Sequence, residues 1–281
     1  MWTDTTRAQH ARSGYGLPSN VTDEEWALIE PLLPPRSGLG RPAKWTYRQI
    51  VNGLFYILRG GLPWRMLPRG TFPPMTTVQH YFYAWRDADL WQTLNHYLLM
   101  EVREACGKEA SPTAGVIDSQ SVKTTESGGI RGFDAGKKIK GRKRHIITDT
   151  NGFLVGGVVH GADVQDRDGA PLVLKSIRSA FPWLRHIFAD GGYAGKQLRA
   201  ALKGKGDWKI EIVKRSDKAK GFVLIPRRWV VERTFAWLNR NRRLAKDFER
   251  TIASATTWLF MASVQQITRR LARLCKEKAS L

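Results

Sequence analysis

Apolar residues recur at helical spacing through the N-terminal third of the chain. The sequence TDEE at 22–25 has Glu three residues after Thr, as in a capping box, and the apolar pattern behind it stops at the Pro-Pro pair 34–35. A second pattern covers 46–60 and ends in Gly-Gly, a third begins at Thr76, and a fourth covers 90–105. These patterns predict four helices, and we expect residues 1–110 to form a small all-helical domain.

From Gly115 the pattern changes to that of β-strands. Strands are predicted over 116–122, 144–149 and 153–159, and the Asn-Gly pair 151–152 is typical of a hairpin turn. Helices and strands then alternate over 169–179, 183–189, 195–202, 209–214 and from 226 onward. The order βββαβαβα predicts an α/β domain over 111–281, with a mixed sheet and flanking helices.

Three further features of the sequence bear on where in the cell the protein is located. The long uncharged stretch 251–268 contains too many Ser, Thr and Gln residues for a membrane span, so it predicts a buried or half-buried helix. Residues 1–14 are polar and show no signal-peptide pattern. Cys106 and Cys275 stand far apart without a CxxC motif, which argues against a disulfide framework or a structural zinc site. We therefore expect a cytoplasmic protein.

The formal net charge of +21 is divided unevenly along the chain. Residues 1–110 carry 12 Lys and Arg against 10 Asp and Glu, whereas residues 111–281 carry 34 against 15. Such an excess indicates a polyanionic partner, since each phosphate that a Lys or Arg neutralises releases condensed counterions. We expect that partner to be DNA, with a generically basic surface as the alternative; a membrane partner fits less well because no amphipathic basic helix is isolated from the fold.

Basic residues are concentrated in a run ahead of the predicted hairpin and along the helix that begins at 226. In the helical domain, a helix-turn-helix would place Arg41, Lys44 and Arg48 near phosphates, although a simple packing bundle explains the pattern equally well. Trp229 and Trp237 alternate with the arginines and are expected in the core. The expected DNA contacts of the second domain, for which a solvated surface is the alternative, are Lys137, Lys138, Lys140, Arg142, Lys143, Arg144, Arg228, Arg233, Arg240, Arg242 and Arg243.

Three acidic residues occupy positions where apolar residues would be expected. Asp118 interrupts an apolar strand, Asp190 ends another just before a Gly-Gly turn, and Glu232 has apolar neighbours on a predicted helix. Burying an unpaired carboxylate is costly, so two of them on one sheet indicate a cation. Oxygen ligands without His or Cys suit Mg²⁺ or Mn²⁺, and such a site suits phosphoryl transfer. Each acid alone also has a structural explanation, in a cap, a turn or an ion pair.

Two weaker candidates for binding sites follow Asp118. The group Asp163, Asp166 and Asp168 could bind a metal, but its spacing after a strand suits a polar loop and the first turn of the next helix better. The segment 191–196 is similar to a phosphate-binding loop. It is one residue too short, and Gln197 stands where Ser or Thr is required, so we expect no nucleotide site there.

Three sequence blocks resemble those of DDE transposases of the insertion sequence five family: DSQSVK at 118–123, ADGGY at 189–193 and RRWVVERTFAWL at 227–238. GRP at 40–42 and GLPWR at 61–65 match its helical region, so the resemblance covers nearly the whole chain. It implies a ribonuclease H-like fold, with Asp118 and Asp190 on neighbouring strands and Glu232 on a following helix. These three residues would be both the catalytic residues and the ligands of Mg²⁺ or Mn²⁺.

The resemblance also implies an activity. Activated water would cleave DNA at the ends of a bacterial insertion sequence, and the freed 3′-hydroxyl would be joined to target DNA by a homo-oligomer assembled on DNA at the nucleoid. Related elements often carry a Tyr-Arg-Glu-Lys signature; Arg228 and Glu232 fit it, whereas Ile225 and Asn239 depart from it. The alternatives are a nuclease of the same fold that does not join DNA, and an inactive DNA-binding relic.

Overall fold

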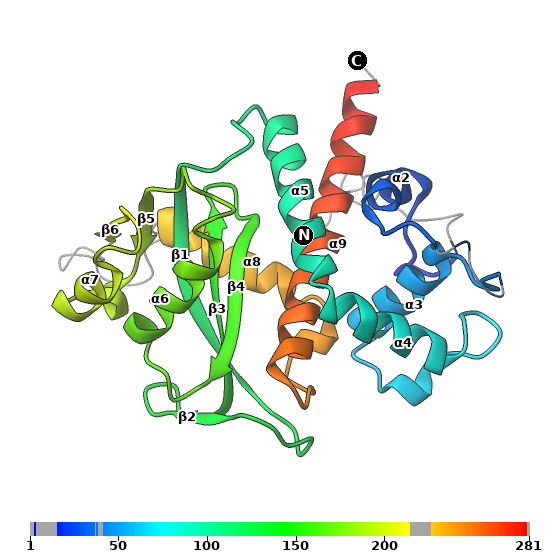
Figure 1. Cartoon of the computed structure of the whole chain (residues 1–281), viewed down its shortest axis with the longest axis horizontal. Helices are drawn as coiled ribbons and strands as arrows, with labels where there is room; N and C mark the ends of the chain where they lie inside the picture. The colour runs from blue at the N-terminus through cyan, green and yellow to red at the C-terminus, as the bar shows by residue number, and fades with distance from the viewer. Residues whose placement is uncertain (1–2, 4–15, 37, 39–41, 214–225, 280–281) are drawn as a thin grey trace.

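The computed structural model describes residues 3, 16–36, 38, 42–213 and 226–279 of the 281-residue chain. Its N-terminal region contains the four predicted helices, which are confirmed, with two short 3₁₀ turns at Glu30–Leu32 and Trp64–Met66. The helices are α2 (Asp23–Ile29), α3 (Tyr47–Gly60), α4 (Met75–Asp87) and α5 (Leu90–Ala105). Figure 1 shows this helical region beside a β-sheet, with α5 nearest to the sheet.

Side chains at the helix ends explain why these segments begin and end where they do. The hydroxyl of Thr22 accepts the backbone N–H of Glu25, and the Glu25 carboxylate accepts that of Thr22, which completes the predicted capping box. Thr46 and Gln49 form the same arrangement at the start of α3. At the end of α3, Gly61 adopts a left-handed conformation with φ of 67°, which glycine tolerates without strain.

The sheet has β1 (Ala114–Lys123) near its centre. On one side β1 pairs antiparallel with β3 (Ile139–Asp149), whose other edge carries β4 (Leu154–Gly161) and the short β2 (Gly132–Asp134), both antiparallel to it. On the other side β1 pairs in parallel with β5 (His186–Ala189), and β5 with β6 (Lys209–Ile212). The mixed sheet is confirmed; β2 is additional, and β3 begins at Ile139, five positions before the predicted start at Arg144.

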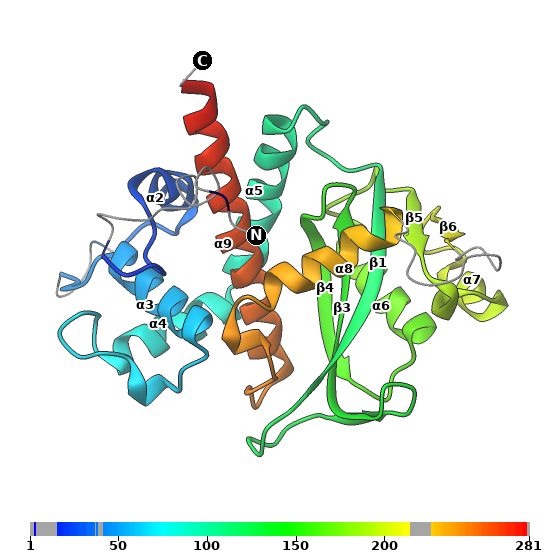
Figure 2. The same cartoon turned by 180° about the vertical axis from the view of Figure 1, so that it is seen from behind.

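Helices cover both faces of this sheet. Helix α6 (Asp166–Ile177) packs on β3 and β4, and α7 (Lys196–Leu202) lies beside it. Helix α8 (Pro226–Leu238) crosses β1 on the opposite face, as the two views show (Figure 1, Figure 2). Short 3₁₀ turns follow β5 at Gly191–Tyr193 and α8 at Arg242–Leu244. The predicted mixed α/β architecture with flanking helices is thus present.

The hairpin turn between β3 and β4 is fixed by a buried carboxylate. Asp149 Oδ1 accepts the backbone N–H groups of Asn151 and Phe153, and Gly152 between them has φ of 92°. Arg103 of α5 donates to Asp149 Oδ2 at 2.5 Å and thereby joins the helical region to the hairpin. The turn predicted from the Asn-Gly pair is confirmed.

The last helix, α9 (Ile252–Ala279), joins the two regions. It packs on α5 and α2 and also on β4, and it stands beside α5 between the sheet and the other helices (Figure 2). Trp258 of α9 is buried and stacks on Phe82 of α4, with ring centroids 4.7 Å apart. The helix predicted from the uncharged stretch is confirmed, and no helix of the described residues is long and apolar enough to cross a membrane. The domain boundary at residue 110 stays a prediction.

Candidate active site

Asp118 and Asp190 are brought together by the register of two parallel strands. The last backbone pair of the β1–β5 ladder is Val116 with Phe188, and each aspartate lies two residues beyond its member of that pair. Parallel strands in register deliver equivalent positions to the same edge of a sheet. The two carboxylates therefore lie near one another where the ladder ends, close enough for the charge of Asp190 to act on Asp118.

The environment of Asp118 disfavours its charged form. Desolvation raises the pKa of Asp118 to about 6, and the negative charges of Asp190 and Asp166 add to this effect. The backbone N–H of Ser119, which donates to Asp118 Oδ1 at 2.7 Å, opposes it only in part. A carboxyl group that is costly to ionise next to other carboxylates is a group whose charged form a cation would stabilise.

Arg228 links the second aspartate to Glu232. Asp190 Oδ1 accepts the backbone N–H of Gly192 at 2.8 Å, which leaves Oδ2 facing Arg228 Nη2 at 3.7 Å. The same guanidinium nitrogen lies 3.7 Å from Glu232 Oε1, one helical turn further along α8. The Glu232 side chain is 51% exposed, so it is the most accessible of the three acids.

The chemical type of the ligands at Asp118 and Asp190 suits a divalent cation, because Mg²⁺ and Mn²⁺ prefer carboxylate oxygens. The two carboxylates also lie close enough to repel each other, which a cation between them would relieve. Across the described ranges, however, no three Asp, Glu, His or Cys side chains are close enough to hold an ion. Asp118 and Asp190 form one part of a site, and Glu232 is connected to it through Arg228.

The family of the chain follows from comparison with known proteins. Residues 109–265, more than half of the chain, match the model of the "Transposase DDE domain", and residues 21–95 match that of the "Putative transposase of IS4/5 family". The chain belongs to the DDE transposases of the IS4/5 family. The predicted family is confirmed.

Two curated proteins from Burkholderia cepacia are similar to this chain. "Putative transposase for insertion sequence element IS402" is 37% identical over 117 residues, which are 39% of this chain and 54% of the relative. "Insertion element IS402 uncharacterized 16.2 kDa protein" is 33% identical over 115 residues, 38% of this chain and 76% of the relative. The chain thus spans about half the length of the first relative. No solved structure matches the chain.

In this DDE transposase, Asp166 contacts the residue that follows Asp118, whereas the sequence predicted only a loop or first-turn role for it. It begins α6, as its assignment to a first helical turn predicted, but its carboxylate also accepts the Ser119 hydroxyl at 2.6 Å. Lys143 of β3 donates to the same oxygen at 2.9 Å. An Asp just after a strand is a visible signal in the sequence; the contact with Ser119, 47 positions away, is not.

A buried Tyr–His pair lies behind the carboxylates. Tyr193 follows the Gly-Gly turn, and its hydroxyl lies 2.8 Å from Nε2 of His145 in β3. Burial, together with the charges of Asp118, Asp166 and Asp190, raises the pKa of Tyr193 above its usual range. Burial and the neighbouring His160 lower the pKa of His145 to about 3. Both rings are therefore neutral near pH 7, and their hydrogen bond connects the turn after Asp190 to β3.

Four of the expected DNA contacts are structural instead. Arg142 is fully buried and donates to Asp247 and to the backbone carbonyls of Ile130, Glu249 and Arg250. Lys143 forms an ion pair with Asp166, and Arg144 donates to the carbonyl of Leu244. Arg243 binds Glu249 and the carbonyl of Leu62. The expectation that these four residues contact phosphate is corrected, because a buried cation is retained only with internal partners of this kind.

The other expected contacts are more accessible. Lys137, Lys138, Lys140, Arg240 and Arg242 are exposed, and Arg228 is half-buried at the acids. Arg233 lies between the rings of Trp229 and Trp237, 4.6 and 4.4 Å from their centroids, and donates to the carbonyl of Asn151. Trp229 is 38% exposed, so the expectation that both tryptophans are core residues is wrong for Trp229.

The residues proposed for a helix-turn-helix also differ in their surroundings. Arg48 forms an ion pair with Asp23 at 2.6 Å and donates to the carbonyl of Val21, so it is engaged within the helical region. Lys44 is exposed and lies over the ring of Trp45. Arg41, like Ile225 of the signature, lies outside the described residues.

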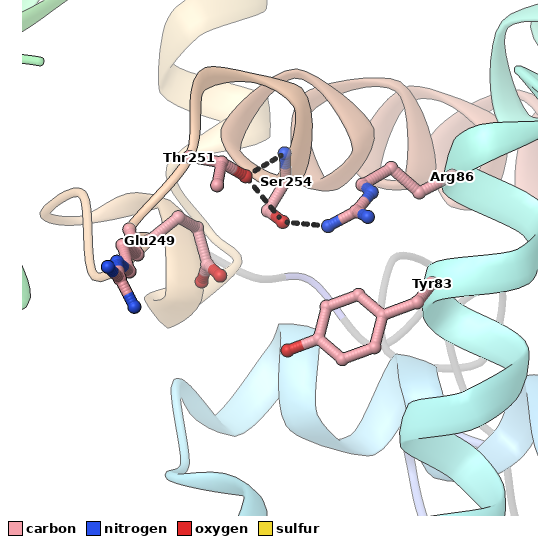
Figure 3. Close-up of a pocket in the computed structure, with 6 residues that line it drawn as sticks. Tyr83, Arg86, Glu249, Thr251 and Ser254 are labelled. Atoms are coloured by element: carbon pink, nitrogen blue, oxygen red, sulfur yellow. Dashed lines mark hydrogen bonds between the residues drawn. The ribbon is translucent and has the colours of Figure 1, made fainter. Parts of the chain in front are cut away.

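A cavity of about 360 Å³ lies apart from the acids, between α4 and the start of α9 (Figure 3). Arg86 stacks on Tyr83 and donates to the hydroxyl of Ser254 at 3.1 Å, which ties α4 to α9. Thr251 caps the N-terminus of α9 by accepting the N–H of Ser254. The residues that line the cavity are Tyr83, Arg86, Glu249, Arg250, Thr251 and Ser254.

Proposed function

We propose that this chain is a transposase that cleaves DNA at the ends of an insertion sequence and joins the freed 3′-hydroxyl groups to target DNA. The observation that carries the proposal is the shared register of Asp118 and Asp190 at the end of the β1–β5 ladder, with Glu232 linked to Asp190 through Arg228. Membership of the DDE transposases supports it. Asp118, Asp190 and Glu232 are accordingly proposed as the catalytic residues.

The proposed fold of the catalytic region is that of ribonuclease H. Its support is the strand order β4-β3-β1-β5-β6, in which three antiparallel strands are followed by two parallel ones, with α6 and α8 on opposite faces. In this arrangement Asp118 lies on the central strand, Asp190 directly follows its parallel neighbour and Glu232 lies on a helix that crosses β1.

In this proposal Asp118 and Asp190 hold Mg²⁺ or Mn²⁺, and Glu232 completes the set. The cation supplies Lewis-acid stabilisation of the phosphate oxygens in the transition state. Arg228 supplies a positive charge at the same place, where it can neutralise a scissile phosphate once its carboxylate partners are otherwise engaged. The buried Tyr193–His145 pair holds the turn that carries Asp190.

DNA is the proposed partner, bound through its phosphates. The exposed cations Lys138 and Lys140 lie at the start of β3, the strand that pairs with β1, and the exposed Arg240 and Arg242 follow α8. The excess of positive charge in residues 111–281 supports this assignment, because it provides the counterion release that drives phosphate binding. Assembly as a homo-oligomer on DNA stays a prediction.

Cleavage of a labelled duplex tests the proposal. The duplex carries the inverted repeats that flank the coding sequence, and the reaction contains Mg²⁺. We expect Asp118→Asn, Asp190→Asn and Glu232→Gln each to lower cleavage by at least about a thousandfold, because each removes a carboxylate used in the transition state. Asp207→Asn is the matched control; its side chain is 90% exposed and pairs with Arg185. Retained cleavage in any of the three variants would remove that residue from the active site.

Strand transfer separates a transposase from a nuclease. A precleaved duplex with a 3′-hydroxyl end is incubated with supercoiled plasmid and Mg²⁺, and joined products are separated on a gel. We expect joining by the wild-type protein and none by Asp190→Asn. Cleavage without joining would assign the chain to the nucleases. If a variant that carries all three changes, Asp118→Asn, Asp190→Asn and Glu232→Gln, functions like the wild type, the chain is a DNA-binding protein and not an enzyme.

A further inference from the structure

The carboxylate of Asp166 reaches the strand that carries Asp118. Ser119, the residue after Asp118, donates its hydroxyl to Asp166 Oδ1 at 2.6 Å. Lys143 Nζ donates to the same oxygen at 2.9 Å and to the carbonyl of Val164 at 2.8 Å. One oxygen of Asp166 is therefore fixed by a neutral and a charged donor, which come from β1 and β3.

The other oxygen faces the turn that follows Asp190. A Cβ atom placed on Gly192 would lie 3.4 Å from Asp166 Oδ2 and 3.0 Å from Asp190 Oδ1. The carboxylates of Asp166 and Asp190 thus flank the same glycine, and a side chain there would fill the space between them. Within the described part of the chain, no hydrogen bond to Asp166 Oδ2 is found.

The contacts of Asp166 also keep it ionised. Burial works against its charge, but the hydrogen bonds from Ser119 and Lys143 outweigh it and lower the pKa of Asp166. Its negative charge in turn disfavours the ionisation of Asp118. The charges of Asp118, Asp166 and Asp190 therefore act on one another, and the buried ammonium of Lys143 pairs with Asp166.

We propose that Asp166 is a fourth acidic residue of the active site, a positioning residue that strengthens the binding of a divalent cation by Asp118 and Asp190. It acts through the charge of Oδ2 beside Asp190 and through the Ser119 hydrogen bond, which fixes the backbone next to Asp118. Partners of this kind behind the ligands typically change metal affinity by about 10–100-fold. The inference rests on the proposed function, because it requires the cation to be held by those two aspartates.

Binding of Mn²⁺ to the full chain without DNA, measured from the electron paramagnetic resonance signal of free Mn²⁺, tests the inference. Asp166→Asn keeps an oxygen that accepts from Ser119 and Lys143 but removes the charge, and we expect about tenfold weaker Mn²⁺ binding. Asp168→Asn is the matched control. It removes a charge from the same helical turn, but Asp168 binds Gln197 on α7, so the affinity should stay within about twofold of wild type.

A second variant, Ser119→Ala, tests the inference in case Asp166→Asn does not fold. Ser119→Ala keeps the Asp166 charge and removes one hydrogen bond to it, and we expect about threefold weaker Mn²⁺ binding. Thermal unfolding in EDTA reports whether each variant is folded. We also expect saturating Mn²⁺ to restore DNA cleavage by Asp166→Asn, which a purely structural role would not produce.

The outcomes separate this inference from the proposed function. If Asp190→Asn loses Mn²⁺ binding while folded Asp166→Asn binds like wild type, the role of Asp166 is overturned and the active site stands. If Asp166→Asn does not fold, unchanged binding by Ser119→Ala overturns it. If Asp190→Asn and Asp118→Asn also bind like wild type, the proposed cation site fails, and the inference with it.

Discussion

Asp190 and Glu232 share one guanidinium group, since Nη2 of Arg228 lies 3.7 Å from Asp190 Oδ2 and 3.7 Å from Glu232 Oε1. Asp190 follows β5 and Glu232 belongs to α8, so Arg228 provides the electrostatic link between the two elements. Its positive charge stands beside the carboxylates that are proposed to hold a cation. Arg228 therefore competes with that cation for the same negative charge.

Replacement of Arg228 tests this competition. We expect Arg228→Gln to bind Mn²⁺ about threefold more tightly, since a partly exposed pair of this geometry contributes up to about 1 kcal/mol. Cleavage should nevertheless fall, because the variant has no positive charge near the scissile phosphate. Arg227→Gln is the control; Arg227 precedes it on α8 but pairs with Glu211. Weaker Mn²⁺ binding by Arg228→Gln would show that the arginine organises the carboxylates and does not compete.

Asp118 makes the stability of the fold depend on pH. Its pKa rises from 3.8 to about 6 on folding, so its ionisation opposes folding: the cost is absent well below pH 3.8, grows between about 4 and 6, and is complete above 6. We expect Asp118→Asn to raise the free energy of unfolding by about 3 kcal/mol at pH 8 and by less at pH 5. Urea unfolding in EDTA at both pH values measures this. Equal gains at the two pH values would mean that ionisation of Asp118 is not the cause.

The local parts of this fold could be predicted from the sequence. Thr22 and Thr46 each start a helix because their hydroxyls accept an N–H three residues later, and the Asn151-Gly152 pair forms a tight turn, so a few neighbouring residues determine each structure. The candidate acids were also visible, since Asp118 interrupts an apolar strand. What the local pattern does not contain is the register that puts Asp118 beside Asp190.

The basic run before the hairpin shows why the remainder could not be predicted. Its charges indicate a solvated segment, yet residues from Ile139 onward form the first half of β3. Arg142 is buried there because Asp247 and the carbonyls of Glu249 and Arg250 receive its guanidinium group. Those partners are more than a hundred positions away, so no window of local sequence reveals that the charge is satisfied internally.

The ion pair between Arg103 and Asp149 is expected to hold the helical region on the sheet. Both side chains are buried, so Arg103→Met leaves an unpaired carboxylate under the hairpin, and we expect a loss of about 3 kcal/mol in the free energy of unfolding. Urea unfolding at pH 7 measures this loss. Arg185→Met is the control, because it breaks the exposed pair with Asp207 and should change stability far less. Similar losses in the two variants would assign no special role to the buried pair.

The exposed cations at the start of β3 and the buried cations within it should behave differently towards DNA. Lys138 and Lys140 are exposed, so the double change Lys138→Gln/Lys140→Gln should weaken binding to duplex DNA without lowering stability. If both lysines bind phosphates, the slope of log K against log salt concentration should fall by about 1.8, or about 0.9 for each phosphate that is no longer neutralised. Fluorescence anisotropy at several salt concentrations measures this slope.

The same assay needs two comparisons to be decisive. Lys175→Gln/Lys203→Gln removes as many charges from the exposed surface of α6 and the end of α7, on the face opposite α8, and should leave the slope unchanged. Arg142→Gln should instead lower the unfolding free energy, because its partners are internal. If the β3 and α6 double variants reduce the slope equally, DNA is attracted by net charge alone and the surface beside the acids is not its binding site.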